Sequence, residues 1–234
     1  MTTNDLDKMT IGEIVADDFR AASIFKNAGI DFCCGGNKGF RETCEEKGIN
    51  PETLVRELNE IVMEPLGPAL NFKDWDLGFL SDYIKNTHHK FVLKNLPELV
   101  YYTQKIASVH GEHHPELIEI AQLFSKINDE LLQHLRNEEE VLFPAIKAVL
   151  NNRNAGSKAV IISEIRRMSG EHEFAGGAMD HISELSNQYL VPDDGCNSYR
   201  MTYKLLQEFE EDLHIHVHLE NNLLYPKALK LAGV

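Results

Sequence analysis

The spacing of hydrophobic and polar positions predicts a short helical region followed by four long helices. Apolar residues recur every three to four positions, and no stretch alternates with period two for long enough to predict a strand. The four long segments cover residues 76–107, 115–150, 157–187 and 198–230. Short stretches rich in Gly, Asn and Pro separate them, so the pattern predicts an all-α fold with an antiparallel four-helix bundle. Pro97, Pro144 and Pro226 are expected to kink or end the helices in which they lie.

The residues before the long helices form a predicted helical unit of their own. Thr10-Ile-Gly-Glu13 is a capping box that opens an amphipathic helix, Gly29 ends a second short helix, and Asn50-Pro51 begins a third. The Pro- and Gly-containing stretch Glu64–Pro68 then predicts a linker. The chain is therefore expected to contain two domains, a small helical one at residues 1–66 and the bundle at residues 67–234.

Composition and charge narrow the functional classes. The chain has 37 acidic and 23 basic side chains, a formal net charge of −14, which argues against nucleic-acid binding because phosphate contacts need clustered Lys and Arg. No apolar run approaches the roughly 20 residues that cross a bilayer. The first residues are polar and acidic, unlike a secretory signal peptide. These features predict a cytoplasmic protein with no nucleic-acid or membrane partner.

The candidate chemistry is concentrated in a repeat shared by the second and fourth long helices. Residues 134–144 and 216–226 both follow the pattern His-x3-Glu-x3-Leu-aromatic-Pro, and the second copy begins 82 residues after the first. Residues four apart lie on one helix face, so His134 with Glu138, and His216 with Glu220, can hold one metal ion or bridge two. A carboxylate on an otherwise apolar face favours a cation, because burying it alone is costly. The alternative is a core His–Glu hydrogen bond, made twice.

If a helical hairpin is duplicated, the first and third long helices should each add a histidine. His172 lies 44 residues before His216. In the first half the spacing favours His89, which lies 45 residues before His134, whereas the apolar helix face favours His88. Periodicity alone leaves these two open. Four His and two Glu suit two first-row metal ions such as iron or manganese, and a set without Cys makes structural zinc less favoured.

The cysteines predict a second functional element. Four cysteines suit a reducing compartment, and Cys33 and Cys34 are adjacent within the segment Asp31-Phe-Cys-Cys-Gly-Gly36. The glycines are expected to expose both sulfurs, and nearby backbone amides can favour a thiolate, which predicts a redox or iron-transfer role. The alternative is a small hydrophobic pair that anchors the domain. Cys44 and Cys196 have no supporting motif and are expected to be small buried or loop residues.

The remaining histidines have no counterpart in the repeat. A surface or interface position is expected for His214 and His218, which flank His216. The cluster of three histidines before Pro115 is expected to lie in a surface loop. His181 has no partner in the pattern. The cluster consists of His110, His113 and His114.

Together these motifs resemble the repair-of-iron-centres family of hemerythrin-like di-iron proteins, which repair iron–sulfur clusters. The resemblance covers nearly the whole chain: residues 31–36 are similar to the family's double-cysteine signature, and residues 87–89, 96–99, 134–144, 171–173 and 216–226 to its bundle segments. It implies two non-haem Fe ions, oxo- or carboxylate-bridged. The implied ligands are His89, His134, His172 and His216, with Glu138 and Glu220 bridging. It also places Glu130 and Glu171 near the iron, for its passage; the alternative for both is a solvated or capping carboxylate.

The resemblance implies repair of clusters damaged by nitrosative or oxidative stress. Iron donation to damaged iron–sulfur proteins or to a cluster-assembly scaffold is favoured over a classical enzyme. Two alternatives use the same bundle: a di-iron enzyme that reduces nitric oxide or activates oxygen, and a hemerythrin-like binder of oxygen or another gas. The sequence leaves a homodimer open.

Overall fold

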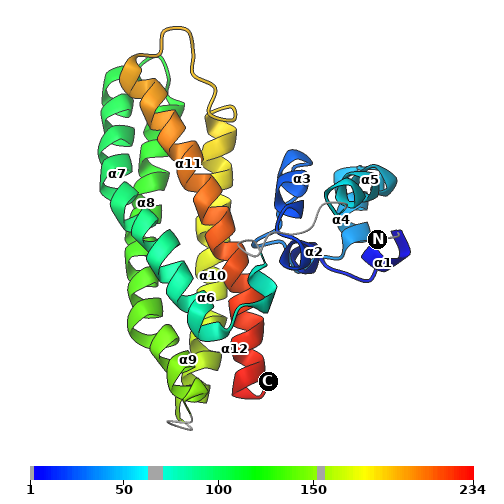
Figure 1. Cartoon of the computed structure of the whole chain (residues 1–234). Coiled ribbons are helices and arrows are strands. Elements are labelled where there is room, and N and C mark those ends of the chain that lie inside the picture. The colour runs from blue at the N-terminus through cyan, green and yellow to red at the C-terminus, as the bar shows by residue number, and fades with distance from the viewer. Residues whose placement is uncertain (1–2, 63–70, 152–155) are drawn as a thin grey trace. The chain divides into compact units, whose positions relative to one another are not determined.

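The computed structural model describes residues 3–62, 71–151 and 156–234, and within these ranges every regular element is a helix (Figure 1). Thr10 and Gly39 form an isolated β-bridge. The all-α prediction is therefore confirmed. None of the helices described is long and apolar enough to cross a membrane. The predicted linker at residues 64–68 lies outside the described residues.

The chain divides into two compact units that do not follow the order of the sequence. Unit 1 comprises Met1–Ser81 together with Ile215–Val234, and unit 2 comprises Asp82–His214. The domain ranges 1–66 and 67–234 stay a prediction.

Unit 2 contains most of the antiparallel four-helix bundle. Its long helices are α7 (Lys90–His110), α8 (Glu116–Asn137), α10 (Gly156–Leu185) and the first part of α11 (Asn197–Leu219). They run side by side in Figure 1, where α8 packs against both α7 and α10. The buried side chains are those of the predicted apolar faces, among them Leu99, Phe124, Ile127, Ile165 and Phe209. The predicted bundle and its helix positions are confirmed.

Three of the four predicted long helices contain a π-helical turn. These turns are η3 (Lys85–His89) between α6 (Leu77–Ile84) and α7, η4 (Glu138–Leu142) between α8 and α9 (Phe143–Leu150), and η5 (Glu220–Leu224) between α11 and α12 (Tyr225–Ala232).

Pro144 and Pro226 explain where two of these three turns, η4 and η5, occur. Pro144 and Pro226 are the second residues of α9 and α12, and a proline cannot donate the α-helical hydrogen bond to the residue four before it. The wider turn before each proline is therefore the same local structure in both copies of the sequence repeat. By contrast, α7 continues through Pro97, so the helix does not end there.

The N-terminal part of unit 1 consists of short helices. The capping box is present: Thr10 Oγ1 accepts from the Glu13 amide at 3.2 Å, and the Glu13 carboxylate accepts from the Thr10 amide at 2.8 Å. Gly29, just past the second predicted helix, has the left-handed φ of 66°. The three predicted helices correspond to α2 (Ile11–Asp17), α3 (Ala21–Asn27) and α5 (Pro51–Val62); α1 (Thr3–Leu6), α4 (Phe40–Lys47) and the 3₁₀ turn η2 (Phe72–Asp74) were not predicted.

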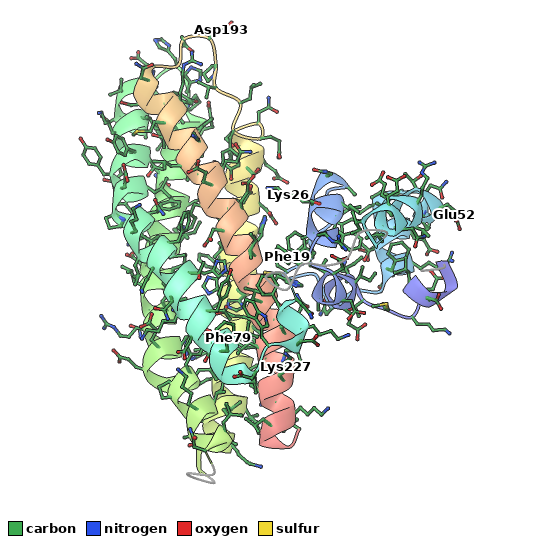
Figure 2. All side chains as sticks on the ribbon, in the orientation of Figure 1. Phe19, Lys26, Glu52, Phe79, Asp193 and Lys227 are labelled. Carbon is green, nitrogen blue, oxygen red and sulfur yellow. The ribbon has the colours of Figure 1, made fainter. Side chains whose placement is uncertain are left out.

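The C-terminal segment belongs to unit 1 through specific polar contacts. Lys227 of α12, labelled in Figure 2, donates to the carbonyl oxygens of Lys73 at 2.7 Å and Trp75 at 2.8 Å. Asn222 of η5 donates to the carbonyl oxygen of Phe32 at 3.2 Å. The cysteine-containing loop is therefore packed on the π-helical turn that begins at Glu220.

Candidate metal centre

Four of the six predicted ligands lie together inside unit 2. His89 ends η3, His134 lies in the last turn of α8, Glu138 begins η4 and His172 lies within α10. All four side chains are at most 3% exposed. Glu138 Oε2 lies 3.3 Å from His89 Nε2 and 3.4 Å from His134 Nε2, and the Nε2 atoms of His134 and His172 are 3.1 Å apart. Three imidazoles and one carboxylate therefore converge in the core.

Two outer carboxylates orient these histidines. Nδ1 of His89 lies 3.0 Å from Glu139 Oε1, and Nδ1 of His134 lies 2.7 Å from Glu171 Oε2. A carboxylate accepts hydrogen bonds, so each Nδ1 carries a proton, and Nε2 is the nitrogen through which each ring can bind a metal. The Nε2 atoms of both rings and the carboxylate oxygen of Glu138 face one another in the core, an arrangement that a shared cation stabilises.

The same contacts keep the outer carboxylates ionised. The hydrogen bond from His134 lowers the pKa of Glu171, although partial burial opposes it. Partial burial raises the pKa of Glu139, but hydrogen bonds from Lys85 and His89 lower it overall. Both groups therefore favour the ionised form that a histidine Nδ1–H needs as acceptor.

Unit 1 contains the other two predicted ligands as an i, i+4 pair. His216 Nε2 lies 2.9 Å from Glu220 Oε1, and neither side chain is more than 1% exposed. His216 lies near the end of α11 and Glu220 begins η5, as His134 lies near the end of α8 and Glu138 begins η4. The sequence repeat is therefore a repeat of local structure as well.

The geometry separates His89 from His88, which periodicity left open. His88 is also buried, but its Nδ1 lies 2.9 Å from Asp212 Oδ1 on α11. Among the contacts described for His88 and His89, only those of His89 place a ring nitrogen beside Glu138. The structure therefore groups His89 with Glu138 and His134.

Of the acidic residues near the predicted centre, Glu171 and Glu139 each contact a histidine of the predicted ligand set. Glu130 is exposed on α8. Sequence reasoning did not single out Glu139. The only sequence signal for Glu139 is that it directly follows Glu138. Because Glu140 belongs to the same run of three glutamates, the pattern does not show whether Glu139 or Glu140 reaches His89.

His218 is the clearest error of the sequence analysis, because it is fully buried rather than at the surface. Its ring packs beside Phe19 and Phe32, with centroid distances of 5.9 Å and 5.8 Å, and its Nδ1 lies 3.4 Å from the Phe32 carbonyl oxygen. Burial lowers the pKa of His218 to about 4, so the ring is neutral. The prediction assumed one buried helix face, whereas the cysteine-containing loop covers a second one.

Apart from the buried His88, the other histidines outside the predicted set are half-buried or exposed. They are His110, His113, His114, His181 and His214. His181 pairs with Glu119 at 3.2 Å, and His114 with Asp194 at 3.1 Å.

The cysteine-containing loop is more closed than the sequence predicted. Cys33 is only 5% exposed and Cys34 is half-buried. Asp31 ties the loop together: Oδ1 accepts from the Cys33 amide at 2.8 Å and lies 3.1 Å from its Sγ, and Oδ2 accepts from the Gly35 amide at 2.7 Å. The prediction that both sulfurs are exposed is therefore wrong for Cys33.

The expected thiolate is also not found at Cys33. A hydrogen bond with Cys34, burial, and the negative charges of Cys34 and Asp31 raise the pKa of the Cys33 thiol well above its usual range. The loop amides that were expected to stabilise a thiolate instead donate to Asp31. Cys44 is buried and Cys196 is exposed. The redox or iron-transfer role of Cys33 and Cys34 stays a prediction.

The donor set determines which ions suit the core of unit 2. Imidazole nitrogen and carboxylate oxygen are ligands for iron, manganese and other first-row metals, and none of the four residues there is a cysteine. All four side chains are buried, and outer carboxylates orient His89 and His134, as in protein metal sites.

Comparisons with known proteins agree with this assignment. A family model described as "Domain of Unknown function (DUF542)", ScdA_N, matches residues 7–62, and the "Hemerythrin HHE cation binding domain" matches residues 82–228. The iron-sulfur cluster repair protein ScdA of Staphylococcus haemolyticus is 34% identical over 97% of this chain and 99% of its own length. YtfE of Pectobacterium atrosepticum, also named an iron-sulfur cluster repair protein, is 32% identical over 94% of this chain and 96% of its own.

A third relative has the same description. The probable iron-sulfur cluster repair protein of Haemophilus influenzae is 34% identical over 89% of this chain and 91% of its own length. Because the hemerythrin model spans more than half of the chain and these relatives align over most of it, the chain belongs to the hemerythrin-like family of the iron–sulfur cluster repair proteins ScdA and YtfE.

Proposed function

We propose that this chain is a di-iron protein that repairs iron–sulfur clusters damaged by nitrosative or oxidative stress, by donating iron to them or to an assembly scaffold. The observation that carries the proposal is the buried group in unit 2, where the Nε2 atoms of His89 and His134 face the Glu138 carboxylate. The names of the relatives supply the biological direction, cluster repair.

The proposed ligand set joins both copies of the repeat. His134, Glu138, His216 and Glu220 occupy equivalent positions in it, which supports assigning them equivalent roles, with the two glutamates bridging two iron ions. His89 and His172 complete the set. The support for His89 is its contact with Glu138, and the support for His172 is its contact with His134.

The surrounding residues account for how iron is held. Glu139 and Glu171 fix the Nδ1 protons of His89 and His134, so that Nε2 of each ring is directed to the metal. Bound iron would supply the ions that a damaged cluster has lost. Imidazole and carboxylate bind only when deprotonated, so retention of iron depends on pH. A cytoplasmic location, proposed from the cysteine usage, would place the chain beside its iron–sulfur targets.

The test is anaerobic repair of a [4Fe–4S] enzyme that has been inactivated with nitric oxide. Three preparations are compared at equal concentration: the iron-loaded chain, the metal-free chain and the Glu138→Gln variant treated with iron. A fourth arm contains free Fe²⁺ at the same iron concentration. We expect recovery of activity with the iron-loaded chain, above that given by free Fe²⁺, and little recovery with the other two preparations. Equal recovery with the metal-free chain would overturn the proposal.

A further inference from the structure

Two basic side chains of unit 2 are connected to the proposed ligand histidines through the outer carboxylates. In the first group, which we call the Lys85 triad, the Glu139 carboxylate has two partners: Oε1 lies 3.0 Å from Nδ1 of His89, and Oε2 lies 2.8 Å from Nζ of Lys85. Lys85 and His89 are the first and last residues of η3, whereas Glu139 lies in η4. The triad therefore joins two π-helical turns beside the centre.

The second group, the Arg167 triad, repeats this arrangement on other elements. Oε2 of Glu171 lies 2.7 Å from Nδ1 of His134, and Oε1 accepts a hydrogen bond from Nη1 of Arg167. Arg167 also donates from Nη2 to Glu164 at 2.5 Å, so two carboxylates of α10 hold its guanidinium group. In both triads one carboxylate oxygen faces a buried histidine and the other oxygen faces a basic side chain.

Exposure to solvent increases along each triad from the histidine outward. The two histidines are at most 3% exposed, the side chains of Glu139 and Glu171 are both 25% exposed, and those of Lys85 and Arg167 are 45% and 39% exposed. A carboxylate in contact with water can rotate and accept from solvent instead of from the histidine. A charge-assisted hydrogen bond to its outer oxygen opposes that rotation.

We propose that Lys85 and Arg167 are positioning residues of the metal centre, each of which holds the carboxylate of its triad against Nδ1 of the ligand histidine. Through that hydrogen bond they keep Nε2 of His89 and of His134 directed to the metal. The inference rests on the proposed function, because it requires that these two histidines bind metal.

Loss of the positive charge has two opposing effects on metal binding. A carboxylate without its cation is a stronger hydrogen-bond acceptor, which favours metal binding by the histidine. This gain is small at a half-exposed position, because water takes the place of the basic group and screens the change in charge. The loss of orientation therefore determines the sign, and the metal affinity should fall.

The first measurement is the affinity for Fe²⁺, obtained without oxygen by competition with a chelator. Lys85→Met keeps the length of the side chain and removes its charge, so the affinity should fall about two- to fivefold, the contribution of a half-exposed ion pair. Lys85→Arg keeps the charge and should restore most of the affinity. Lys94→Met, the same change at an exposed residue of α7, should match the wild type. Arg167→Met and its exposed neighbour Arg166→Met form a second such pair.

A double variant shows whether Lys85 acts through Glu139. The carboxylate is absent in Glu139→Gln, so the addition of Lys85→Met should cause no further loss of affinity. Independent effects of the two changes, on folding or on net charge, would instead multiply. Glu171→Gln with Arg167→Met makes the same comparison for the second triad.

Proton NMR of the Co²⁺-loaded chain follows the hydrogen bond itself, because the paramagnetic ion separates the Nδ1–H signals of bound histidines from the rest of the spectrum. Glu139→Gln and Glu171→Gln assign the signals of His89 and His134. Lys85→Met should speed solvent exchange of the His89 proton alone, whereas a general loosening of the fold would speed both. Unchanged exchange, or losses that multiply in the double variant, would overturn this inference and leave the proposed function intact. A wild-type chain that binds no metal at these histidines would overturn both.

Discussion

At the scale of single residues, the group that faces Nε2 separates the histidines proposed as metal ligands from a buried histidine of the core. His89 and His134 each direct Nδ1 to an outer carboxylate, which leaves Nε2 available beside Glu138. Nδ1 of His218 lies 3.1 Å from the side-chain nitrogen of Asn222 and 3.4 Å from the Phe32 carbonyl oxygen, and the ring packs beside two phenylalanines. Residue type alone does not distinguish these two situations, but the presence of the Glu138 carboxylate beside Nε2 does.

Glu139→Gln tests the orienting role of an outer carboxylate. A neutral amide oxygen accepts the Nδ1–H of His89 more weakly than a carboxylate does, so the metal affinity should fall by about 10-fold or more. Competition with a chelator measures the affinity. Glu140→Gln, the same change at the exposed neighbouring residue, is the matched control and should match the wild type. Equal losses in both variants would point to net charge rather than to the contact with His89.

The two adjacent cysteines should differ in their reactivity. Cys33 is buried, and its raised pKa keeps it a thiol, so alkylation should require a pH well above the value of about 8.5 at which a free cysteine ionises. The half-buried Cys34 and the exposed Cys196 should react first. Mass spectrometry of peptides after timed iodoacetamide treatment between pH 7 and pH 10 gives the order. Alkylation of Cys33 at pH 7 as fast as that of Cys196 would contradict the closed loop.

At the scale of elements, the helices followed from the sequence but their π-turns did not. Apolar spacing located the four long segments to within a few residues, since the buried face of an amphipathic helix repeats along the chain. The prolines indicated a disturbance at the right places. Whether a helix ends, kinks or widens by one residue depends on tertiary packing, and so Pro97 lies within a continuous helix whereas Pro144 follows a π-turn.

The residues of the candidate site could be predicted from the sequence to about the same extent as the helices. Repetition singled out four candidate ligand positions without any structure, because both copies keep the same residues at the same spacing. The spacing of residues alone did not decide between His88 and His89. The contact of His89 with Glu138 in the structure separates the two. The burial of His218 depends on Phe32, 186 residues earlier in the chain, which no local pattern reveals.

Gly12→Ala tests the packing of α2 against η5 within unit 1. A Cβ at residue 12 would lie 2.1 Å from Oδ1 of Asn222 and 2.9 Å from the carbonyl oxygen of Gly36. The resulting overpacking should lower the free energy of unfolding by about 1–3 kcal/mol. Gly170→Ala, where the Cβ meets open space on α10, should instead raise it by about 0.5–1 kcal/mol. Urea denaturation measures both, and a stabilised Gly12→Ala variant would rule out the close packing.

At the scale of the whole molecule, the six proposed ligands are divided between the two compact units. His89, His134, Glu138 and His172 belong to unit 2, whereas His216 and Glu220 belong to the part of unit 1 that is contributed by the C-terminal segment. A ligand that binds only the folded state stabilises every part whose folding is needed to bind it. Iron should therefore stabilise both units if all six residues are ligands.

Trp75 allows this to be measured, since it is the chain's single tryptophan and lies in unit 1. Its ring packs between Phe72 and Phe79, at centroid distances of 4.7 Å and 4.8 Å, so its fluorescence reports the folding of that unit. At a free iron concentration of 1,000 times Kd, binding adds about 4 kcal/mol to the stability, and the denaturation midpoint seen by Trp75 should rise.

His172→Ala, a change in unit 2, should reduce the iron-induced shift of the Trp75 midpoint strongly, because the iron then binds more weakly. His181→Ala, a change at an exposed histidine of the same helix, should keep the shift. Far-UV circular dichroism, to which the helices of both units contribute, is followed in parallel, and a transition separate from that of Trp75 gives the midpoint for unit 2. If iron raises that midpoint and leaves the Trp75 midpoint where it is, His216 and Glu220 are not ligands, and the centre is confined to the three histidines and Glu138 of unit 2.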